Sequence, residues 1–240
     1  MSRLFGKTVR VAGTSQSIAR AAALGLATAG GQVLIQHGGD AKRAETTAEQ
    51  LRKVGARAGT VFADLADPQG PHRLAKQARG IIGDRLDILV ANMGTAKATT
   101  FEDATPADFD GIFAANVRAA CFLVQQFLPL MCRDSCIIYV MASAARSPSD
   151  MPSGYAVTMG AIEAITRHFA STLRPRGMRV NLIVVGEAEA DLSNFTSCLA
   201  SCGHPFSRQA KRLEQLNDVG TAVAALASND VRLSPAIPCG

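Results

Sequence analysis

Val11-Ala12-Gly13-Thr14-Ser15-Gln16-Ser17-Ile18-Ala19 joins a short apolar strand to an Ala-rich helix through a tight turn. A turn of this kind presents backbone N–H groups at a helix N-terminus, where they can bind the phosphates of a dinucleotide. Small residues at positions 13, 17 and 19 permit a close approach of the backbone, although only Gly13 is glycine. Taken alone, the turn is a weak indication of a nucleotide site at the end of the first strand.

Beyond this turn, short apolar runs alternate with longer Ala- and Leu-rich stretches that have helical spacing. The apolar runs predict strands over residues 8–12, 32–37, 58–63, 86–91, 136–141 and 179–184. The longer stretches predict helices over residues 19–29, 41–54, 73–82, 107–130, 154–173 and 217–227. Strands that are apolar on both faces and joined by helical crossovers form a parallel sheet that is buried from both sides. The sequence therefore predicts an α/β fold over residues 1–240, a single-domain, Rossmann-like, doubly wound parallel sheet with helices on both faces.

Residues 187–213 break this rhythm, because they are polar and contain both cysteine and glycine. A long insertion beside the strand ends of an α/β sheet is usually a lid over a ligand. We expect a lid or substrate loop at about 187–213, and the alternative is a surface loop with no such role.

The composition of the 240 residues, 48% hydrophobic and 19% charged, suits one soluble globular domain. The 25 Lys and Arg are offset by 20 Asp and Glu along the chain, so we expect contact with phosphates and no nucleic-acid partner. The apolar stretches 21–35 and 119–131 are interrupted by polar residues or glycine and are shorter than a typical membrane span. We therefore expect no membrane partner and, without a secretory leader, a cytoplasmic location.

Six cysteines lie at positions 121, 132, 136, 198, 202 and 239, without the dense spacing of a secreted disulfide scaffold. Reduced thiols are the default prediction. Cys198, Cys202 and His204 could supply three ligands to zinc, because residues four apart share a helix face, but a structural site needs a fourth. We therefore predict no metal, and interpret this segment as a loop with free thiols.

Four further segments fall in the order and spacing of the short-chain dehydrogenase/reductase family, which the chain resembles over nearly its whole length. They are Asp64-Leu65 after the third strand, Ala91-Asn92-Met93-Gly94 after the fourth, Asn116-Val117-Arg118 in the long helix, and Ser143 with Tyr155, continued by Arg179-Val180-Asn181. The resemblance implies a nicotinamide cofactor and proton transfer to or from a carbonyl or alcohol.

The resemblance also implies which residues hold the cofactor. The turn would bind the pyrophosphate, the end of the second strand the adenosine ribose, and the segments after the third and fourth strands the adenine and the back of the cofactor. The expected cofactor-binding residues are Gly13, Ser15, Ser17, Ile18, His37, Asp64, Leu65, Asn92 and Gly94. Departures from the family pattern are Ser17 and Ala19 in place of glycines, Ala91, Met93, Val185 and Ala190.

The expected catalytic residues are Ser143, Tyr155 and Asn116, but Met159 stands where the family has its lysine, four residues after the tyrosine. An ammonium about 4 Å from the phenol, at an effective dielectric constant near 20, is worth roughly 4 kcal/mol, or about three pKa units. Without it, the pKa of Tyr155 should stay near the free value of about 10, and proton transfer should be slower. Arg146 could supply a positive charge instead, although the ordinary interpretation is a solvated loop arginine.

The choice of cofactor depends on the end of the second strand, where an acidic residue would bind the ribose in an NAD enzyme. His37 occupies that position, and Lys42 and Arg43 follow it. The absence of a carboxylate favours NADP. The alternative for Lys42 and Arg43 is the exposed first turn of a helix.

These observations predict an NADP-preferring oxidoreductase that acts on a small-molecule carbonyl or alcohol, with impaired or altered catalysis. One alternative is a nucleotide- or ligand-binding protein that has lost catalysis, and another is a cofactor-free dehydratase, isomerase or cyclase that uses Ser143 and Tyr155. The long apolar helices over 107–130 and 154–173 also favour a homodimer or homotetramer, because the resemblance implies a four-helix interface there.

Overall fold

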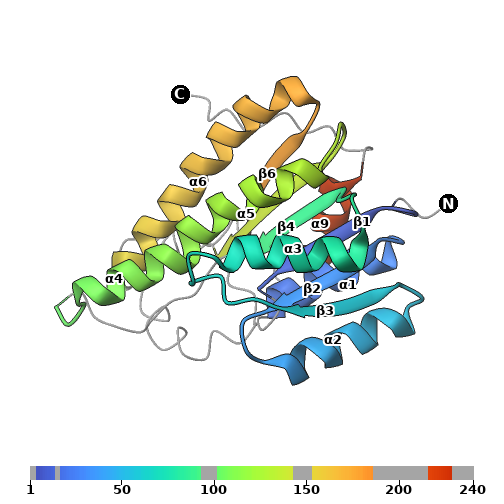
Figure 1. The fold of residues 1–240 in the computed structure, drawn as a ribbon, viewed down its shortest axis with the longest axis horizontal. Helices are drawn as coiled ribbons and strands as arrows, with labels where there is room; N and C mark the ends of the chain where they lie inside the picture. Colours follow the sequence, from blue (N-terminus) through green and yellow to red (C-terminus); the bar gives the residue numbers. More distant parts are fainter. Residues whose placement is uncertain (1–3, 14–16, 93–101, 143–152, 186–215, 229–240) are drawn as a thin grey trace.

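A six-stranded parallel sheet forms the centre of the molecule, in the order β3-β2-β1-β4-β5-β6 (Figure 1). The structure is a computed structural model that describes residues 4–13, 17–92, 102–142, 153–185 and 216–228. The strands are β1 (Thr8–Ala12), β2 (Gln32–His37), β3 (Ala58–Phe62), β4 (Ile88–Asn92), β5 (Cys136–Ala142) and β6 (Arg179–Val185). Each predicted strand is present, with its ends within two residues of the prediction.

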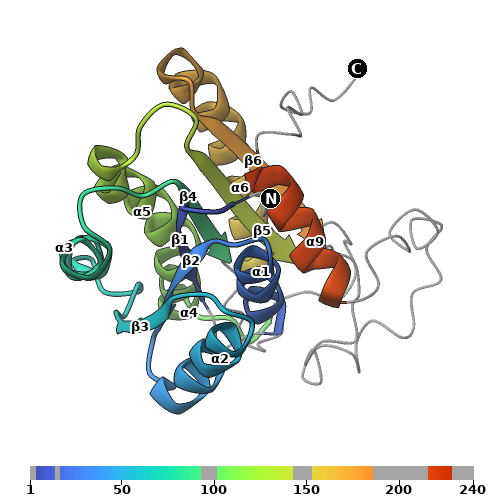
Figure 2. The same ribbon diagram turned by 90° about the vertical axis from the view of Figure 1, so that its right-hand side faces the viewer.

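Helices cover both faces of this sheet (Figure 2). One face, which we call the first face, packs against α1 (Ser17–Thr28), α2 (Ala41–Lys53) and α9 (Leu216–Ala227). The other, the second face, packs against α3 (Gly70–Ile82), α5 (Ala119–Phe127) and α6 (Ser153–Leu173). The predicted doubly wound α/β fold is therefore confirmed.

The long helix predicted over residues 107–130 is a composite of four segments. It consists of α4 (Pro106–Phe113), a π-helical segment (Ala114–Arg118), α5 and a 3-10 turn (Leu128–Leu130). The prediction of one continuous α-helix was wrong in the middle, where the π-helical segment widens the turn around Asn116. Segments of this kind are frequent at functional sites.

The order of strands places ligand-binding residues at one edge of the sheet. β1 pairs with both β2 and β4, so the chain winds outward in opposite directions from β1. In open parallel sheets, ligands bind beside the carboxyl ends of the strands at such a reversal. We call this side the carboxyl edge, and the opposite side the amino edge.

On the first face, α1 and α9 touch through their backbones. A Cβ atom on Gly25 would lie 2.2 Å from the Gly220 carbonyl oxygen, and one on Gly220 would lie 2.6 Å from the Ala21 carbonyl oxygen. Only glycine fits at either position without moving a helix. The first and last described helices are thus joined at their closest contact by two glycines.

The second face contains a buried arginine. Arg10 on β1 is fully buried, and its guanidinium nitrogens have no hydrogen-bond partner in the part of the chain that the structure describes. The guanidinium carbon lies 4.6 Å from the centre of the Phe127 ring, a cation–π contact. Burial lowers the pKa of Arg10 to about 9. A buried charge without a partner is destabilising, so this side chain lowers the stability of the folded protein.

One run of helix, Pro106–Leu130, is long and apolar enough to cross a membrane by length and composition. Of its most apolar window, 44% is buried inside the molecule, where α5 packs on the sheet. Core helices of soluble proteins pass the same test, so this helix is weak evidence for a membrane span.

Candidate active site

The turn after β1 requires a glycine. Gly13 has a φ of +83°, and a Cβ atom built on it would lie 2.5 Å from the carbonyl oxygen of Asn92 at the end of β4. Both the backbone conformation and the space therefore exclude a side chain. Two predicted cofactor residues, Gly13 and Asn92, meet here at the strand-order reversal.

Gln36 holds this turn in place, and the sequence analysis did not single it out. Its side-chain oxygen accepts a hydrogen bond from the Gly13 N–H at 3.0 Å, and its amide nitrogen donates to the Ala63 carbonyl oxygen at 2.8 Å. The side chain is buried and so ties the end of β1 to the segment after β3. A polar residue inside an otherwise apolar strand was the available signal.

His37 lies beside this turn with a buried polar atom unsatisfied. The residue is 7% exposed, and its Nδ1 has no hydrogen-bond partner in the described residues. Its ring is tilted against that of Phe62, with the ring centres 5.7 Å apart, and Phe62 itself is 55% exposed. Buried polar atoms in native proteins normally have partners, so the orphaned nitrogen fits a site that a ligand completes.

The segment after His37 begins α2. The Asp40 side chain caps this helix by accepting a hydrogen bond from the Arg43 N–H at 2.9 Å. Lys42 and Arg43 therefore lie in the exposed first turn of α2, as one of the two interpretations expected. Their position at the carboxyl edge also leaves them near the end of β2.

The other predicted cofactor residues have varied surroundings. Asp64 is exposed, and its carboxylate accepts a hydrogen bond from the Ala66 N–H at 2.9 Å. Leu65 packs against the core of the second face and Ile18 against that of the first. Ser17 is the first residue of α1. Ser15 and Gly94 lie outside the described residues.

Asn116 connects the π-helical segment to α6. Its side chain is fully buried, and its Nδ2 donates a hydrogen bond to Thr158 Oγ1 at 3.1 Å. Thr158 Oγ1 in turn donates to the backbone carbonyl of Tyr155 at 2.8 Å. Thr158, which the sequence analysis missed, therefore links two of the predicted catalytic residues.

Tyr155 and Met159 lie in one apolar cluster. Tyr155 is 4% exposed and Met159 is fully buried, and both pack with Met141 of β5, with Leu182 and Val184 of β6 alongside. Residues four apart on a helix share a face. A thioether thus stands where the family resemblance puts an ammonium, and it supplies no charge to a phenolate.

The second tyrosine of the chain is an unsuitable proton donor. The Tyr139 hydroxyl donates to the Ala120 carbonyl oxygen at 3.1 Å inside the core of the second face. Burial raises the pKa of Tyr139 well above its usual value. This leaves Tyr155 as the tyrosine available at the carboxyl edge. Ser143 and Arg146 lie outside the described residues.

No group of three or more His, Cys, Asp or Glu residues within the described ranges could hold a metal ion. Cys198, Cys202 and His204 lie outside those ranges, as does the expected lid at 187–213. Among the described cysteines, Cys121, Cys132 and Cys136 are free thiols.

Comparison with known sequences shows the family. A profile of the family described as Enoyl-(Acyl carrier protein) reductase matches residues 12–234. The short-chain dehydrogenase/reductase FrzI from Cladobotryum sp is 34% identical over 79% of this chain and 73% of its own length. A hydroxynaphthalene reductase-like protein, Arp2 from Metarhizium brunneum, is 32% identical over 79% of this chain and 71% of its own.

Solved structures agree with these relatives. A short-chain dehydrogenase from Burkholderia cenocepacia J2315 in complex with NADP has a TM-score of 0.83 at 29% identity, covering 95% of this chain and 93% of that one. The angucycline C-6 ketoreductase LanV with bound NADP has a TM-score of 0.84 at 31% identity, covering 95% and 91%. Because sequence and fold agree over nearly the whole chain, the protein belongs to the short-chain dehydrogenase/reductase family of nicotinamide-dependent oxidoreductases.

Proposed function

We propose that the protein is an NADP-preferring oxidoreductase of a small-molecule carbonyl or alcohol, with catalysis slowed or altered by Met159. The observation that carries this proposal is the position of Tyr155. It is buried at the carboxyl edge and packs with Met159 in an apolar cluster, and Thr158 links its backbone to Asn116. The NADP complexes of the Burkholderia and LanV structures support the choice of cofactor.

The described residues fit a nicotinamide dinucleotide. Gly13 leaves room for a close approach of the pyrophosphate, and Gln36 holds the backbone of the turn beside the Asn92 carbonyl. His37 offers an unsatisfied Nδ1 at the end of β2, where a carboxylate would repel a 2′-phosphate. NADPH would supply the hydride when bound.

The chain's own residues would manage the proton. The Tyr155 hydroxyl would donate to the substrate carbonyl oxygen, Ser143 would hydrogen-bond the same oxygen, and Asn116 would position α6. A phenolate left on Tyr155 would face the buried Met159 thioether, where no ammonium offsets the cost of desolvation. Slow turnover follows from this arrangement.

A second candidate is a nucleotide-binding protein without turnover. The full burial of Met159 favours it, because a packed thioether leaves no place for a solvent cation to take over the role of the lysine. A cofactor-free dehydratase, isomerase or cyclase is the third candidate, and it would need Ser143 and Tyr155 but no nucleotide.

Fluorescence titration of the protein with NADPH and NADH separates these candidates. The expected result is binding of both, tighter for NADPH, with the preference reduced or reversed in His37→Asp. Binding accompanied by slow carbonyl reduction would support the oxidoreductase, and binding without any turnover would support the second candidate. If neither NADPH nor NADH binds, the oxidoreductase and the nucleotide-binding candidates are both overturned. The cofactor-free reaction then remains, and loss of product in Ser143→Ala is its test.

The substrate panel can be chosen from the relatives. One relative is named as hydroxynaphthalene reductase-like, and LanV was crystallised with rabelomycin. We therefore propose to test rabelomycin and fused-ring aromatic ketones beside simple aliphatic ketones. Equal rates on both classes would argue against a preference for aromatic ketones.

We also propose that two copies of the chain associate through α4, α5 and α6. Four large apolar side chains on these helices are between 37% and 51% exposed, namely Phe109, Phe113, Phe122 and Val157. Phe109 and Phe113 stack with their ring centres 6.0 Å apart. Exposed apolar patches of this kind usually mark interfaces. Light scattering should give the molar mass of a dimer or tetramer for the wild type. For Phe122→Asp it should give the molar mass of a monomer.

A cytoplasmic location is proposed as well, because the three described free thiols suit a reducing compartment. Fractionation of cells that express the full chain is the direct check.

A further inference from the structure

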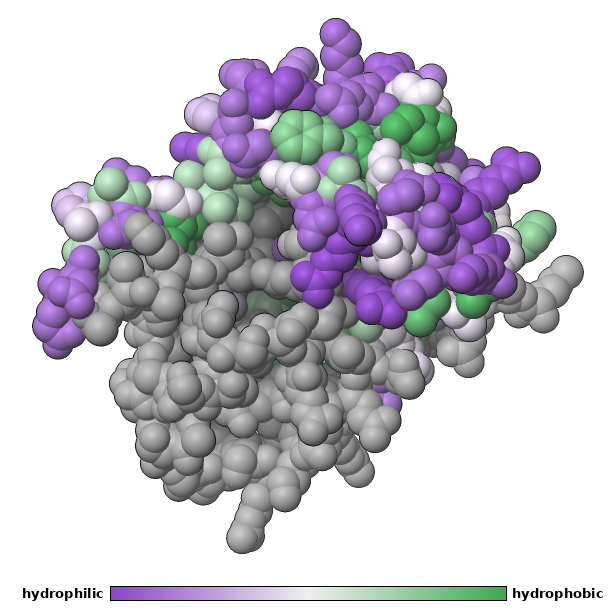
Figure 3. Space-filling view, turned by 90° about the horizontal axis from the view of Figure 1, so that it is seen from below, coloured by the Kyte–Doolittle hydropathy of each residue, from purple (hydrophilic) through white to green (hydrophobic). Residues whose placement is uncertain are grey.

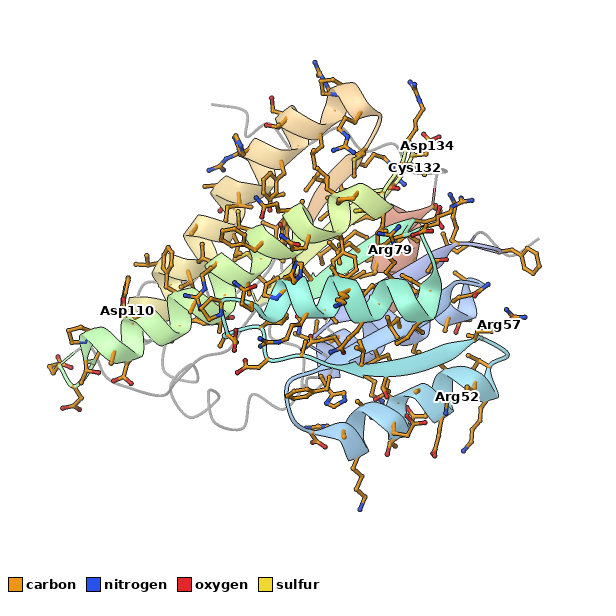
Figure 4. The ribbon with its side chains drawn as sticks, viewed as in Figure 1. Arg52, Arg57, Arg79, Asp110, Cys132 and Asp134 are labelled. Carbon is orange, nitrogen blue, oxygen red and sulfur yellow. The ribbon has the colours of Figure 1, made fainter. Side chains whose placement is uncertain are left out.

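The amino edge of the sheet, opposite the candidate active site, has an unusual surface. Backbone hydrogen bonds fix its loops side by side: the N–H of Val33 donates to the Arg57 carbonyl, that of Gln32 to Lys7, and that of Asp87 to Thr8. Figure 4 shows Arg52, Arg57, Arg79 and Asp134 at this end of the molecule, with Asp110 at the other. The side chains of these loops therefore form one continuous surface.

Positive charge accumulates on this surface. Lys7 and Arg85 share a single carboxylate, with their nitrogens 3.2 Å and 2.7 Å from Asp87 Oδ1. On this surface, the exposed cations without an ion pair to a described residue are Lys53, Arg57, Arg133, Arg174 and Arg176, against one such acid, Asp134. A surface with an excess of positive charge attracts an anionic partner, and its cations repel one another when no partner is present.

Three of these cations form a tight group at the end of the surface near β6. Arg174 and Arg176 lie in the short 3-10 turn before that strand, and Arg133 lies against Gly177, which follows the turn. A Cβ atom on Gly177 would lie 2.8 Å from Arg133 Cγ, so the arginine side chain rests directly on the glycine. The backbone N–H of Asp134 also donates to the Gly177 carbonyl at 3.0 Å.

Large apolar side chains protrude among the cations. Phe5, in the turn before β1, is 85% exposed. Val54 at the end of α2 is 49% exposed, and Ile81 in the last turn of α3 is 57% exposed. In the view from below, hydrophobic residues stand between hydrophilic ones toward this end (Figure 3).

We propose that the amino edge binds the surface of an anionic lipid membrane. Lys and Arg would interact with acidic headgroups, while Phe5, Val54 and Ile81 would enter the headgroup region. Aliphatic side chains such as Val54 and Ile81 gain nothing from stacking on bases, which favours lipid over nucleic acid. This surface departs from the expectation of no membrane partner, and it requires no membrane-spanning helix.

The geometry also fixes the orientation of the bound protein. Because the two edges are opposite ends of the same strands, the candidate nucleotide site would face the water. Lipid binding is therefore independent of the proposed oxidoreductase function, and NADPH affinity should be the same with and without vesicles.

Sedimentation with vesicles tests the proposal on the full chain. Vesicles of phosphatidylcholine with about 30% phosphatidylserine should carry the protein down, and vesicles of phosphatidylcholine alone should not. Raising the ionic strength from about 0.1 M to about 1 M should release it, because the Debye length falls from about 10 Å to about 3 Å. Equal sedimentation with both vesicle types, or with neither, overturns the proposal.

Variants separate the two contributions to binding. Lys53→Glu combined with Arg57→Glu should weaken binding about tenfold or more, and Phe5→Ser should weaken it while leaving the salt dependence intact. Lys53→Glu alone should weaken binding as well, and Lys76→Glu, the same single reversal midway along α3, is its matched control and should bind normally. Unchanged binding in the double variant overturns the proposal, as does tight binding to duplex DNA or RNA by a protein that ignores the anionic vesicles.

Discussion

The two faces of the sheet differ in what they bury. The first face, under α1, α2 and α9, buries apolar and small side chains, and its closest contact is between Gly25 and Gly220. The second face, under α3, α5 and α6, also buries Arg10, Asn116 and Thr158. The first face is held mainly by close packing, with the Arg179 guanidinium donating to the Leu226 and Ala227 carbonyls at the end of α9. The energetics of the second face depend on whether each of its buried polar groups has a partner.

Three cases on the second face illustrate this dependence. Asn116 has a partner in Thr158 and joins two helices. Arg10 has no hydrogen-bond partner among the described residues, and its buried charge lowers the free energy of unfolding. At Met159 a charge is missing where the neighbouring Tyr155 would need one.

Restoring that charge should have the largest effect on the second face. Met159→Lys should raise the rate of carbonyl reduction by about a thousandfold, since the ammonium is worth roughly 4 kcal/mol beside a phenolate. The measurement is NADPH oxidation in single-turnover experiments with a panel of ketones. Met159→Leu, which keeps the cluster apolar, is the control and should leave the rate unchanged. A lysine variant that folds, binds NADPH and shows no gain would mean that more than the missing charge limits the reaction.

Removing the unpaired charge should stabilise the second face. Burial depresses the pKa of Arg10 from 12.5 to about 9, a cost of about 5 kcal/mol, of which the Phe127 contact returns about 2 kcal/mol. Arg10→Leu should therefore raise the free energy of unfolding by about 3 kcal/mol in urea denaturation, whereas Arg10→Lys should not.

The pH dependence of this stability difference follows from the direction of the shift. Below pH 9 the folded protein carries the buried charge and the full cost applies. Above pH 9 the folded side chain releases its proton while the unfolded one keeps it, so the stability of the wild type should rise toward that of Arg10→Leu. A constant difference from pH 7 to pH 11 would contradict this account.

The first face should be sensitive to added volume instead. Gly25→Ala places a Cβ atom 2.2 Å from the Gly220 carbonyl oxygen, and forcing α1 and α9 apart should cost about 2 kcal/mol. Gly80→Ala in α3 is the matched control, because a Cβ atom there meets nothing within 4 Å. That variant should gain up to about 1 kcal/mol from helix propensity. Equal melting temperatures for the two variants would remove the contrast between the faces.

The smallest expected effect concerns Gln36, which points toward the second face at the carboxyl edge. Gln36→Leu leaves the Gly13 N–H without its partner, and the turn should loosen enough to weaken NADPH binding about tenfold. Gln50→Leu, which removes only an exposed contact with Arg20, should bind normally. Unchanged affinity in Gln36→Leu would show that the turn holds its shape without the clamp.

The helices, the strands and the succession of site residues along the chain could be predicted from the sequence. The contacts between distant segments could not. Strand and helix positions follow from local periodicity, and the need for glycine at position 13 follows from the turn itself. The Gln36 clamp, the Asn116–Thr158 bond and the Gly25–Gly220 contact join residues far apart in the chain. Local pattern cannot show such pairs, because they exist only once the sheet has set the register.

The burial of Arg10 was missed for a related reason. A sheet buried from both sides was predicted from the sequence, but the consequence for Arg10 was not drawn, because a charge between Val9 and Val11 is, by local pattern alone, more typical of an exposed face. β1 lies in the middle of the sheet, with β2 and β4 on either side and helices on both faces, so every one of its side chains is enclosed.

The contact between α1 and α9 also constrains the order of folding. α1 begins at the nucleotide turn near the start of the chain, and α9 is the last described helix, so their contact closes a loop of nearly the whole sequence. Contacts between such distant segments form late in folding, because the entropy of closing the loop must be met first. During synthesis, the face of α1 that packs on α9 therefore stays uncovered until α9 has left the ribosome, and an unfinished chain can associate with other chains through it.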